Sequence, residues 1–191
     1  MNRLILFSGG VESTALLSLA TPNDILVTIR DESPNGIPLT YEPEAVRTIS
    51  EHYGFKVNYC SVKLPYDEGK PKFVYQLWLF HSIVSLWLAK DSSVKEVWYG
   101  LNKEEYSKVY KDFQNIKDSW PILHPSVELK HPLVHLSKEE QWNLIPGDVK
   151  PMVRNCLFNF NCRQCKKCLE LKKLKGSVLS VLSSRSNLEN D

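Results

Sequence analysis

The feature that most constrains this chain is an apolar run near the N-terminus that ends in two glycines. Residues 4–14 read Leu-Ile-Leu-Phe-Ser-Gly-Gly-Val-Glu-Ser-Thr. The apolar run predicts a buried strand, the glycines permit a tight turn, and residues 12–20 contain helix formers. A helix that begins here presents unpaired N–H groups and the positive end of its dipole, which together favour an anion. The sequence therefore predicts a phosphate-binding turn between a strand and a helix, although an ordinary glycine turn is the alternative.

Polar side chains in the same segment add candidate ligands for phosphate. The hydroxyls of Ser8, Ser13 and Thr14 can donate hydrogen bonds. Glu12 can hold the Mg²⁺ that accompanies a triphosphate. We therefore predict Ser8, Glu12 and Ser13 as the catalytic residues of this segment.

The rest of the chain alternates between strand and helix patterns. Strands are predicted over 3–7, 25–29, 56–62 and 96–101, and helices over 12–20, 42–53, 73–89, 103–117 and 169–182. The segment 127–136 is predicted to be extended, with Pro132 at an edge or a bend. Ser137 begins a further helix, because Ser137 and Glu140 have the spacing of a capping box. This order predicts an α/β fold with a Rossmann-like parallel sheet covered on both faces.

The predicted organisation has an α/β nucleotide-binding domain over 1–150. It is followed by a cysteine segment with a closing helix over 151–183 and a polar tail over 184–191.

Residues 73–89 contain no charged side chain but hold Gln76 and His81, and the run is shorter than the roughly 20 residues of a membrane span. We expect a buried or interface helix there, no membrane partner and, with no signal-peptide pattern, a cytoplasmic protein.

Four of the five cysteines lie close together, as Cys156-x5-Cys162-x2-Cys165-x2-Cys168. Four thiolates at this spacing suit tetrahedral zinc, and the basic side chains nearby favour the thiolate form. The alternatives are an iron–sulfur cluster, for which the usual following Cys-Pro is missing, and free or disulfide-bonded thiols. The fifth cysteine, Cys60, is expected in the core.

Seven Lys or Arg and one Glu lie in the segment from Arg154 to Lys175. This basic run is either a solvated face or a surface for phosphate or RNA.

The segment Ser8 to Ser13 resembles the S-G-G-x-D-S loop of PP-loop ATP pyrophosphatases, with Glu12 in place of the motif's Asp. The resemblance implies that ATP is split to AMP and pyrophosphate. The ATP contacts that it implies are Leu6, Phe7, Ser8, Gly9, Gly10, Glu12, Ser13, Thr14, Ile29 and Arg30.

Combined with the cysteine segment, the loop resembles the QueC family, the 7-cyano-7-deazaguanine synthases. The stretch 132–140 is also similar to that family's proline–leucine segment, which precedes a helix with a Ser-Lys start. The resemblance implies ATP, Mg²⁺ and Zn²⁺ as cofactors, a homodimer, and adenylation of the carboxylate of 7-carboxy-7-deazaguanine before attack by ammonia. Weaker substrate candidates are Tyr99, Gly100, Asn102 and Glu105. The family's motifs after the second and fourth strands are replaced here.

Three other functions stay open. QueC-like proteins also occur in anti-phage defence, where the acceptor is expected to be an amine on a partner protein. A tRNA-thiolation enzyme would join the loop to reactive cysteines and a basic face. A nucleotide-binding module without turnover is the last alternative. The net charge of only +2 does not indicate a nucleic-acid partner.

Overall fold

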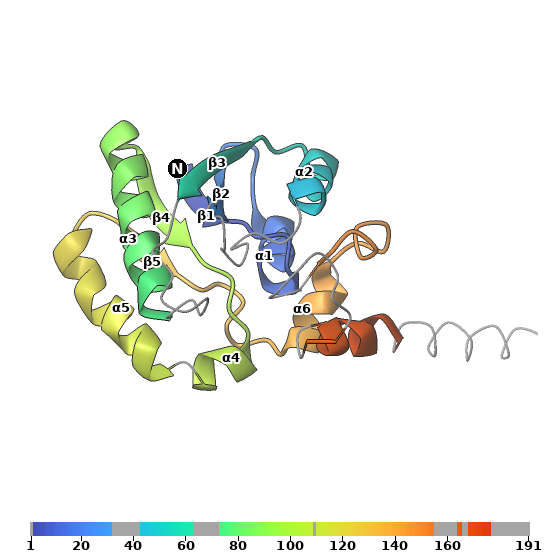
Figure 1. Cartoon of the computed structure of the whole chain (residues 1–191). Helices are drawn as coiled ribbons and strands as arrows, with labels where there is room; N and C mark the ends of the chain where they lie inside the picture. Colours follow the sequence, from blue (N-terminus) through green and yellow to red (C-terminus); the bar gives the residue numbers. More distant parts are fainter. Residues whose placement is uncertain are drawn as a thin grey trace, which may run out of the picture.

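The computed structural model describes residues 2–31, 43–62, 73–108, 110–154, 164–165 and 168–176. Its centre is a sheet of five strands in the order β3-β2-β1-β4-β5, with every pair parallel (Figure 1). The strands are β1 (Asn2–Leu6), β2 (Ile25–Asp31), β3 (Val57–Val62), β4 (Val94–Trp98) and β5 (Glu128–Lys130).

The strand order changes direction beside β1, and this determines where a ligand can bind. From β1 the chain proceeds outward through β2 and β3, and then returns to add β4 and β5 on the other side. β1 and β4 are neighbours in the sheet. The chain leaving the carboxyl end of β1 leads to β2 on one side, whereas the chain leaving β4 leads to β5 on the other. In open α/β sheets, ligands bind in the crevice outside such a switch point.

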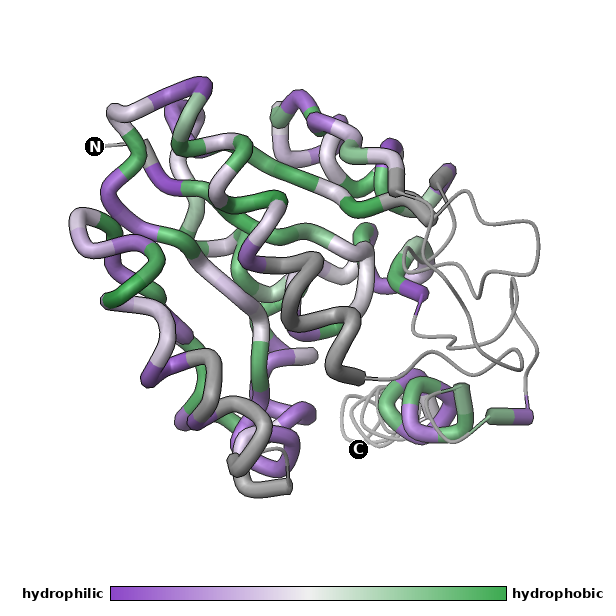
Figure 2. Tube along the Cα trace, turned by 60° about the vertical axis from the view of Figure 1, so that its left-hand side comes forward, coloured by the Kyte–Doolittle hydropathy of each residue, from purple (hydrophilic) through white to green (hydrophobic). Residues whose placement is uncertain are grey.

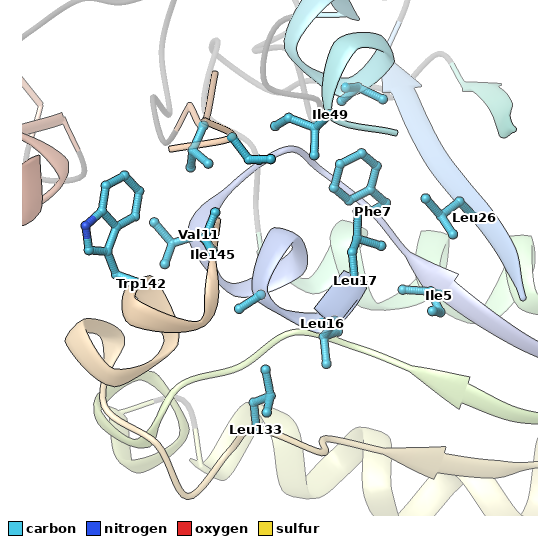
Figure 3. Packing of buried hydrophobic residues seen from close by; sticks show 14 of the residues in the cluster. Ile5, Phe7, Val11, Leu16, Leu17, Leu26, Ile49, Leu133, Trp142 and Ile145 are labelled. Carbon is cyan, nitrogen blue, oxygen red and sulfur yellow. The ribbon is translucent and has the colours of Figure 1, made fainter. Parts of the chain in front are cut away.

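Helices cover both faces of the sheet, because alternate side chains of the strands are apolar on both sides. Ile5 and Phe7 join a cluster with α1 (Val11–Leu16), the 3₁₀ turn η1 (Leu17–Leu19), α2 (Pro43–His52) and α6 (Lys138–Leu144) (Figure 3). Leu4 and Leu6 join the opposite cluster, to which α3 (Phe73–Lys90) and α5 (Tyr110–Leu123) contribute. Apolar stretches run along the central strands, while strongly hydrophilic stretches lie on outer turns and helices (Figure 2). The predicted α/β fold with a doubly covered parallel sheet is confirmed.

Several predicted elements differ in detail from the structure. The single helix expected over 103–117 is two helices, α4 (Lys103–Lys108) and α5, and α5 continues through Pro121 near its end. Extended backbone in the segment 127–136 is limited to the short edge strand β5, and turns follow it. The capping box at Ser137 is present, with the Ser137 hydroxyl accepting from the Glu140 amide.

The long apolar helix is buried along only part of its surface. In the portion of α3 whose side chains the structure describes, Ile83 and Val84 are buried, whereas Leu86 is 69% exposed. None of the described helices is long and apolar enough to cross a membrane. The last described helix covers 168–176, so the remainder of the predicted closing helix and the polar tail lie outside the described residues.

Candidate phosphate-binding site

The loop after β1 turns through Gly9, whose φ of 74° suits glycine far better than an L-residue with a side chain. A Cβ at this position would also lie 3.3 Å from a methyl carbon of Val46 on α2. The Gly9 carbonyl accepts a hydrogen bond of 3.1 Å from the amide of Arg154, which fixes the turn from outside. Gly9 therefore allows the backbone to turn sharply between β1 and α1.

Two serine hydroxyls brace the loop from within. The Ser13 hydroxyl accepts from the Ser8 amide at 3.2 Å and donates to the Gly10 carbonyl at 3.3 Å. Since that bond uses the Ser13 hydrogen, the Ser8 hydroxyl is the donor in the 3.0 Å contact between the two hydroxyls. The Gly10 amide in turn donates to the Ser8 hydroxyl at 3.4 Å. Ser8 and Ser13, both predicted as catalytic, thus hold the loop in shape through their hydroxyls.

Glu12 lies at the centre of a network of polar side chains from distant parts of the chain. Only 8% exposed, it accepts a 2.8 Å hydrogen bond from the Asn102 amide through Oε1. The same oxygen is 3.0 Å from Nζ of Lys138, and that ammonium is also 3.2 Å from a carboxylate oxygen of Glu170. Asn102 is held in turn, because its Oδ1 accepts from the Glu105 amide at 2.8 Å. One lysine therefore lies between two carboxylates beside the loop.

The carboxyl end of β4 packs directly against the start of α1. A Cβ on Gly100 would lie 2.8 Å from the backbone carbon of Glu12 and 2.9 Å from the Ser13 nitrogen. This contact explains how Asn102, which follows Gly100 closely, reaches Glu12. The structure thus brings Gly100, Asn102 and Glu105 next to the loop, as their predicted positions at a strand end require.

Tyr99 lies at the same edge of the sheet. Its carbonyl contacts Nδ1 of His131 at 3.0 Å, and the two rings meet edge to face. The residue keeps 37% of its surface exposed. Although part of the residue faces solvent, neighbouring groups partly desolvate the phenol, and this desolvation, with the nearby charges of Glu105 and Glu12, raises the pKa of Tyr99 to about 12. The phenol is therefore a neutral hydrogen-bonding group at physiological pH.

The remaining predicted ATP contacts are mostly core positions. Leu6 is 7% exposed and Phe7 2%, and the Phe7 amide and carbonyl are both bonded to β2. Thr14 is fully buried, and its hydroxyl has no partner among the described residues. Ile29 packs against the second apolar cluster, and Arg30 is on β2 beside it, with its side chain outside the described residues.

Lys138 and Glu170 were missed as site residues by the sequence analysis. Lys138 is the first residue of α6, where a positive charge opposes the helix dipole and acidic side chains are preferred. An unfavourable cation at that position is the signal that could have identified Lys138. Glu170 carries no comparable signal, because an isolated Glu in a basic helix usually faces solvent.

The described residues do not form a ready magnesium site at Glu12. Its Oε1 is already bound by an ammonium and an amide. Nowhere in the described ranges do three or more His, Cys, Asp or Glu side chains gather as metal ligands.

Of the four predicted zinc ligands, Cys165 and Cys168 are described, whereas Cys156 and Cys162 lie outside the described residues. The Cys168 amide donates to Sγ of Cys165 at 3.4 Å. This arrangement at the start of a helix fits a thiolate metal ligand pair, because N–H donors stabilise sulfur that carries negative charge. The donor set suits zinc or an iron–sulfur cluster equally.

Comparisons with known proteins identify the fold. No family model matches the sequence, and no curated protein matches it. Among solved structures, the chain is similar to the U34-tRNA thiolase NcsA from Methanococcus maripaludis, determined with its [4Fe-4S] cluster. The TM-score is 0.58 at 15% identity, over 100% of this chain and 73% of that one. The chain therefore has the α/β architecture of that enzyme.

Proposed function

We propose that the chain is a PP-loop enzyme that binds ATP and releases pyrophosphate and AMP. The observation that carries this proposal is the braced Ser8–Ser13 loop at the sheet's switch point, with the side chains of Asn102 and Lys138 meeting on Glu12. A glycine turn that leads into the N-terminus of a helix at such a point suits a phosphate chain. The similarity in fold to a tRNA thiolase is consistent with this function.

In the proposed reaction, an acceptor oxygen attacks the α-phosphorus of ATP. The bond from the α-phosphorus to the bridging oxygen breaks, and pyrophosphate leaves with that electron pair. A nitrogen nucleophile then attacks the adenylated carbon, and AMP departs. The loop contributes orientation and donors that need no rearrangement during reaction.

For the acceptor, we propose a carboxylate of the 7-carboxy-7-deazaguanine type, with ammonia or an amine as the nucleophile. The QueC-like pairing of this loop with the cysteine segment supports it, as does the Ser137–Lys138 start of α6. Tyr99, Asn102 and Glu105 are then the candidates for contacting the base. Conjugation of the deazaguanine to a partner protein's amine is the variant expected of a defence enzyme.

A second candidate function is tRNA thiolation, which the fold of the tRNA thiolase favours. The cysteine segment and its basic surroundings are compatible with it. In that case the acceptor is a base oxygen of tRNA, and the cysteines hold an iron–sulfur cluster instead of zinc.

The decisive experiment follows radiolabelled ATP with each acceptor in turn: 7-carboxy-7-deazaguanine with ammonia, the same acid with a protein amine, and tRNA with a sulfur donor. We expect AMP and pyrophosphate with the deazaguanine acid, and a fixed mass gain on a protein acceptor if conjugation occurs. AMP formation with tRNA alone favours thiolation. ATP binding without AMP under any acceptor identifies a nucleotide-binding module and contradicts the proposed reaction.

A matched pair of variants connects any activity to the loop. Ser13→Ala removes the hydroxyl that ties Ser8 to Gly10 and is expected to lower turnover strongly. Ser18→Ala removes a hydroxyl of η1 that donates to the Ala15 carbonyl of α1, and it should leave turnover unchanged. Equal loss in both variants would argue against the loop as the site.

A further inference from the structure

We propose that Ser119 and His81 form a second catalytic site, positioned by His124, in which Ser119 is a nucleophile toward carboxylic esters with a small apolar acyl group. The site is separate from the phosphate loop, because α3 and α5 cover the face of the sheet opposite to α1 (Figure 1). The proposal goes beyond the ATP reaction and does not depend on it.

The three side chains are connected by successive polar contacts. The Ser119 hydroxyl on α5 is 3.4 Å from Nε2 of His81 on α3. The other nitrogen of that ring, Nδ1, is 3.4 Å from Nε2 of His124, which directly follows α5. A hydroxyl, a base and a group that orients the base, in this order, are the parts of an activated serine. Such contacts are often long before a substrate binds.

The two imidazole rings meet through their facing nitrogens. Their planes are inclined by only 17°, and the ring centres are 5.6 Å apart. Because the facing nitrogens are much closer, at 3.4 Å, they lie near the line that joins the ring centres. When Nδ1 of His81 donates to His124 along this line, Nε2 of His81 carries the lone pair that accepts the Ser119 proton.

Trp120 holds the two rings in this alignment. Its ring centre is 5.5 Å from that of His81 and 4.5 Å from that of His124. The indole is itself fixed, because its N–H donates a 2.7 Å hydrogen bond to the Val127 carbonyl. Side chains locked by packing and by a further hydrogen bond are what a catalytic arrangement requires.

The burial of two imidazoles favours a functional role over a purely structural one. His81 is 7% exposed and His124 4%, and both contact Trp120 of the second apolar cluster. Burying polar rings costs free energy that apolar side chains would avoid. Burial also lowers the pKa of His81, so its base form persists to lower pH than in a free imidazole. A buried imidazole beside a hydroxyl is a typical general base.

Ser119 is the part of the site that a substrate can reach. It is only partly buried, whereas the two histidines behind it are buried. Ile122 lies three residues further along α5, so it is a neighbour of Ser119 on the helix surface, and it is 80% exposed. An exposed isoleucine beside the hydroxyl suits a small apolar acyl group.

In the proposed reaction, the Ser119 oxygen bonds to the ester carbonyl carbon while its proton passes to Nε2 of His81. The ester C–O bond then breaks, and the leaving alcohol takes that proton. Water attacks the acyl carbon in the second half and gives a proton to Nε2. The bond from the acyl carbon to Ser119 breaks, and the serine oxygen recovers the proton.

The experiment treats the full chain with an alkyl fluorophosphonate, which bonds stably to activated serines, and locates the label by peptide mass. We expect one label, on Ser119, and none on Ser119→Ala. Hydrolysis of p-nitrophenyl butyrate should fall about a hundredfold in Ser119→Ala and in His81→Gln, since general-base assistance is lost. Ser85→Ala is the matched control, because Ser85 is exposed on α3, and it should keep both the label and the rate.

A pair of variants tests the positioning role of His124. His124→Leu removes the acceptor for Nδ1 of His81 and should lower kcat about tenfold or more with KM unchanged. His124→Gln supplies a carbonyl oxygen in its place and should restore most of the rate. ¹⁵N NMR of the wild-type chain should show the proton of His81 on Nδ1.

Thermal unfolding confirms that each variant is folded before its rate is interpreted. A wild-type chain that takes no label, or takes it on another residue, overturns the proposal. Unchanged labelling in folded His81→Gln also overturns it. Equal rates in His124→Leu and His124→Gln contradict the role of His124. Because these assays contain no ATP, each result leaves the ATP reaction to be decided by its own experiment.

Discussion

Gly100 and Glu12 touch through their backbones, so the exit of β4 is fixed against the first turn of α1. A Cβ on Gly100 would be 2.8 Å from the Glu12 carbon and 3.0 Å from its carbonyl oxygen. These are backbone atoms that cannot turn aside as a side chain could. The distance between the loop and Asn102 therefore depends on the absence of one methyl group.

Gly100→Ala is expected to lower the free energy of unfolding by about 1–3 kcal/mol, as overpacking does in other proteins. It should also weaken ATP binding, because α1 must shift. Urea unfolding and calorimetry measure the two effects. Gly147→Ala is the control, since a Cβ there meets no atom within 4 Å, and it should change neither quantity. Similar behaviour of the two variants would contradict the packing argument.

Asn102→Ala removes the amide that donates to Glu12 and the oxygen that accepts from the Glu105 amide. Because Asn102 is 1% exposed, we expect a loss of about 1–3 kcal/mol in the free energy of unfolding. Asn102→Asp keeps the acceptor for Glu105 but sets a second carboxylate against Glu12. It should therefore recover stability at acid pH, where one carboxylate is protonated, whereas Asn102→Ala should not. Parallel pH profiles for the two variants would count against this account.

His81 on α3 and His124 after α5 form a buried pair, 7% and 4% exposed, with ring nitrogens 3.4 Å apart. Burial lowers the pKa of both rings, and the charge of His81 lowers that of His124 further. In the folded chain both rings therefore take up protons at lower pH than in the unfolded chain, where histidine has its ordinary pKa of about 6.5. The free energy of unfolding should be highest above that pH. It should fall as the pH drops through it, by at most about 1.4 kcal/mol per pH unit for each ring.

His124→Gln should flatten this acid dependence, because one of the two titrating groups is removed. Urea unfolding between pH 7 and pH 5 measures the slope. His135→Gln is the comparison, since the His135 ring is exposed to solvent. A slope that is unchanged in His124→Gln would contradict the assignment of the acid sensitivity to this pair.

Asp24 is a structural carboxylate that directly precedes β2. It lies at the amino ends of the strands, whereas the loop lies at their carboxyl ends. Arg3 Nε donates to it at 2.7 Å and the Thr21 amide at 2.6 Å, and the Arg3 guanidinium also lies 4.1 Å from the Trp98 ring. Burial alone would raise the pKa of Asp24, but the bonds from Arg3 and Thr21 outweigh it and hold the pKa below its usual range. Its contribution is therefore complete above the unfolded pKa of about 3.9 and is lost as the pH falls through the folded value.

Asp24→Asn should cost about 3 kcal/mol at neutral pH, because the Arg3 charge loses its buried partner. ATP binding should be unchanged, because Asp24 lies at the end of the strands away from the loop. The control is Glu128→Gln, which breaks an ion pair with Lys130. The Glu128 side chain in that pair is 68% exposed. It should cost less than about 1 kcal/mol. Chemical denaturation at pH 7 and pH 3 tests both variants.

Metal content tests the cysteine segment. We expect zinc in stoichiometric amount in the purified chain, and its loss in Cys168→Ser. Cys60→Ser should retain the metal, because Cys60 lies on β3, where it accepts a bond from the Trp87 indole at 3.3 Å. Iron with acid-labile sulfide in place of zinc would contradict the zinc assignment and favour the thiolase-like function.

The sequence predicts the sheet well because each strand is a short apolar run followed by a turn. It also places the loop correctly, since Gly9 and the flanking serines all lie within the short segment 8–13. It predicts α4 and α5 as one helix, because a polar helical pattern carries no mark of a break. It misses Lys138 and Glu170 because Lys138 pairs with Glu12 and Glu170 pairs with Lys138, and contacts between residues so far apart in the chain leave no local pattern.

The network on Glu12 also bears on how the protein is made. Glu12 is synthesised before Asn102, and Asn102 before Lys138 and Glu170, although the four residues form one network in the fold. A nascent chain can complete β1 to β3 and still hold a buried carboxylate without its cation. The site thus acquires its charge balance only after Lys138 has been synthesised, and a chain that stops before this residue is left without it.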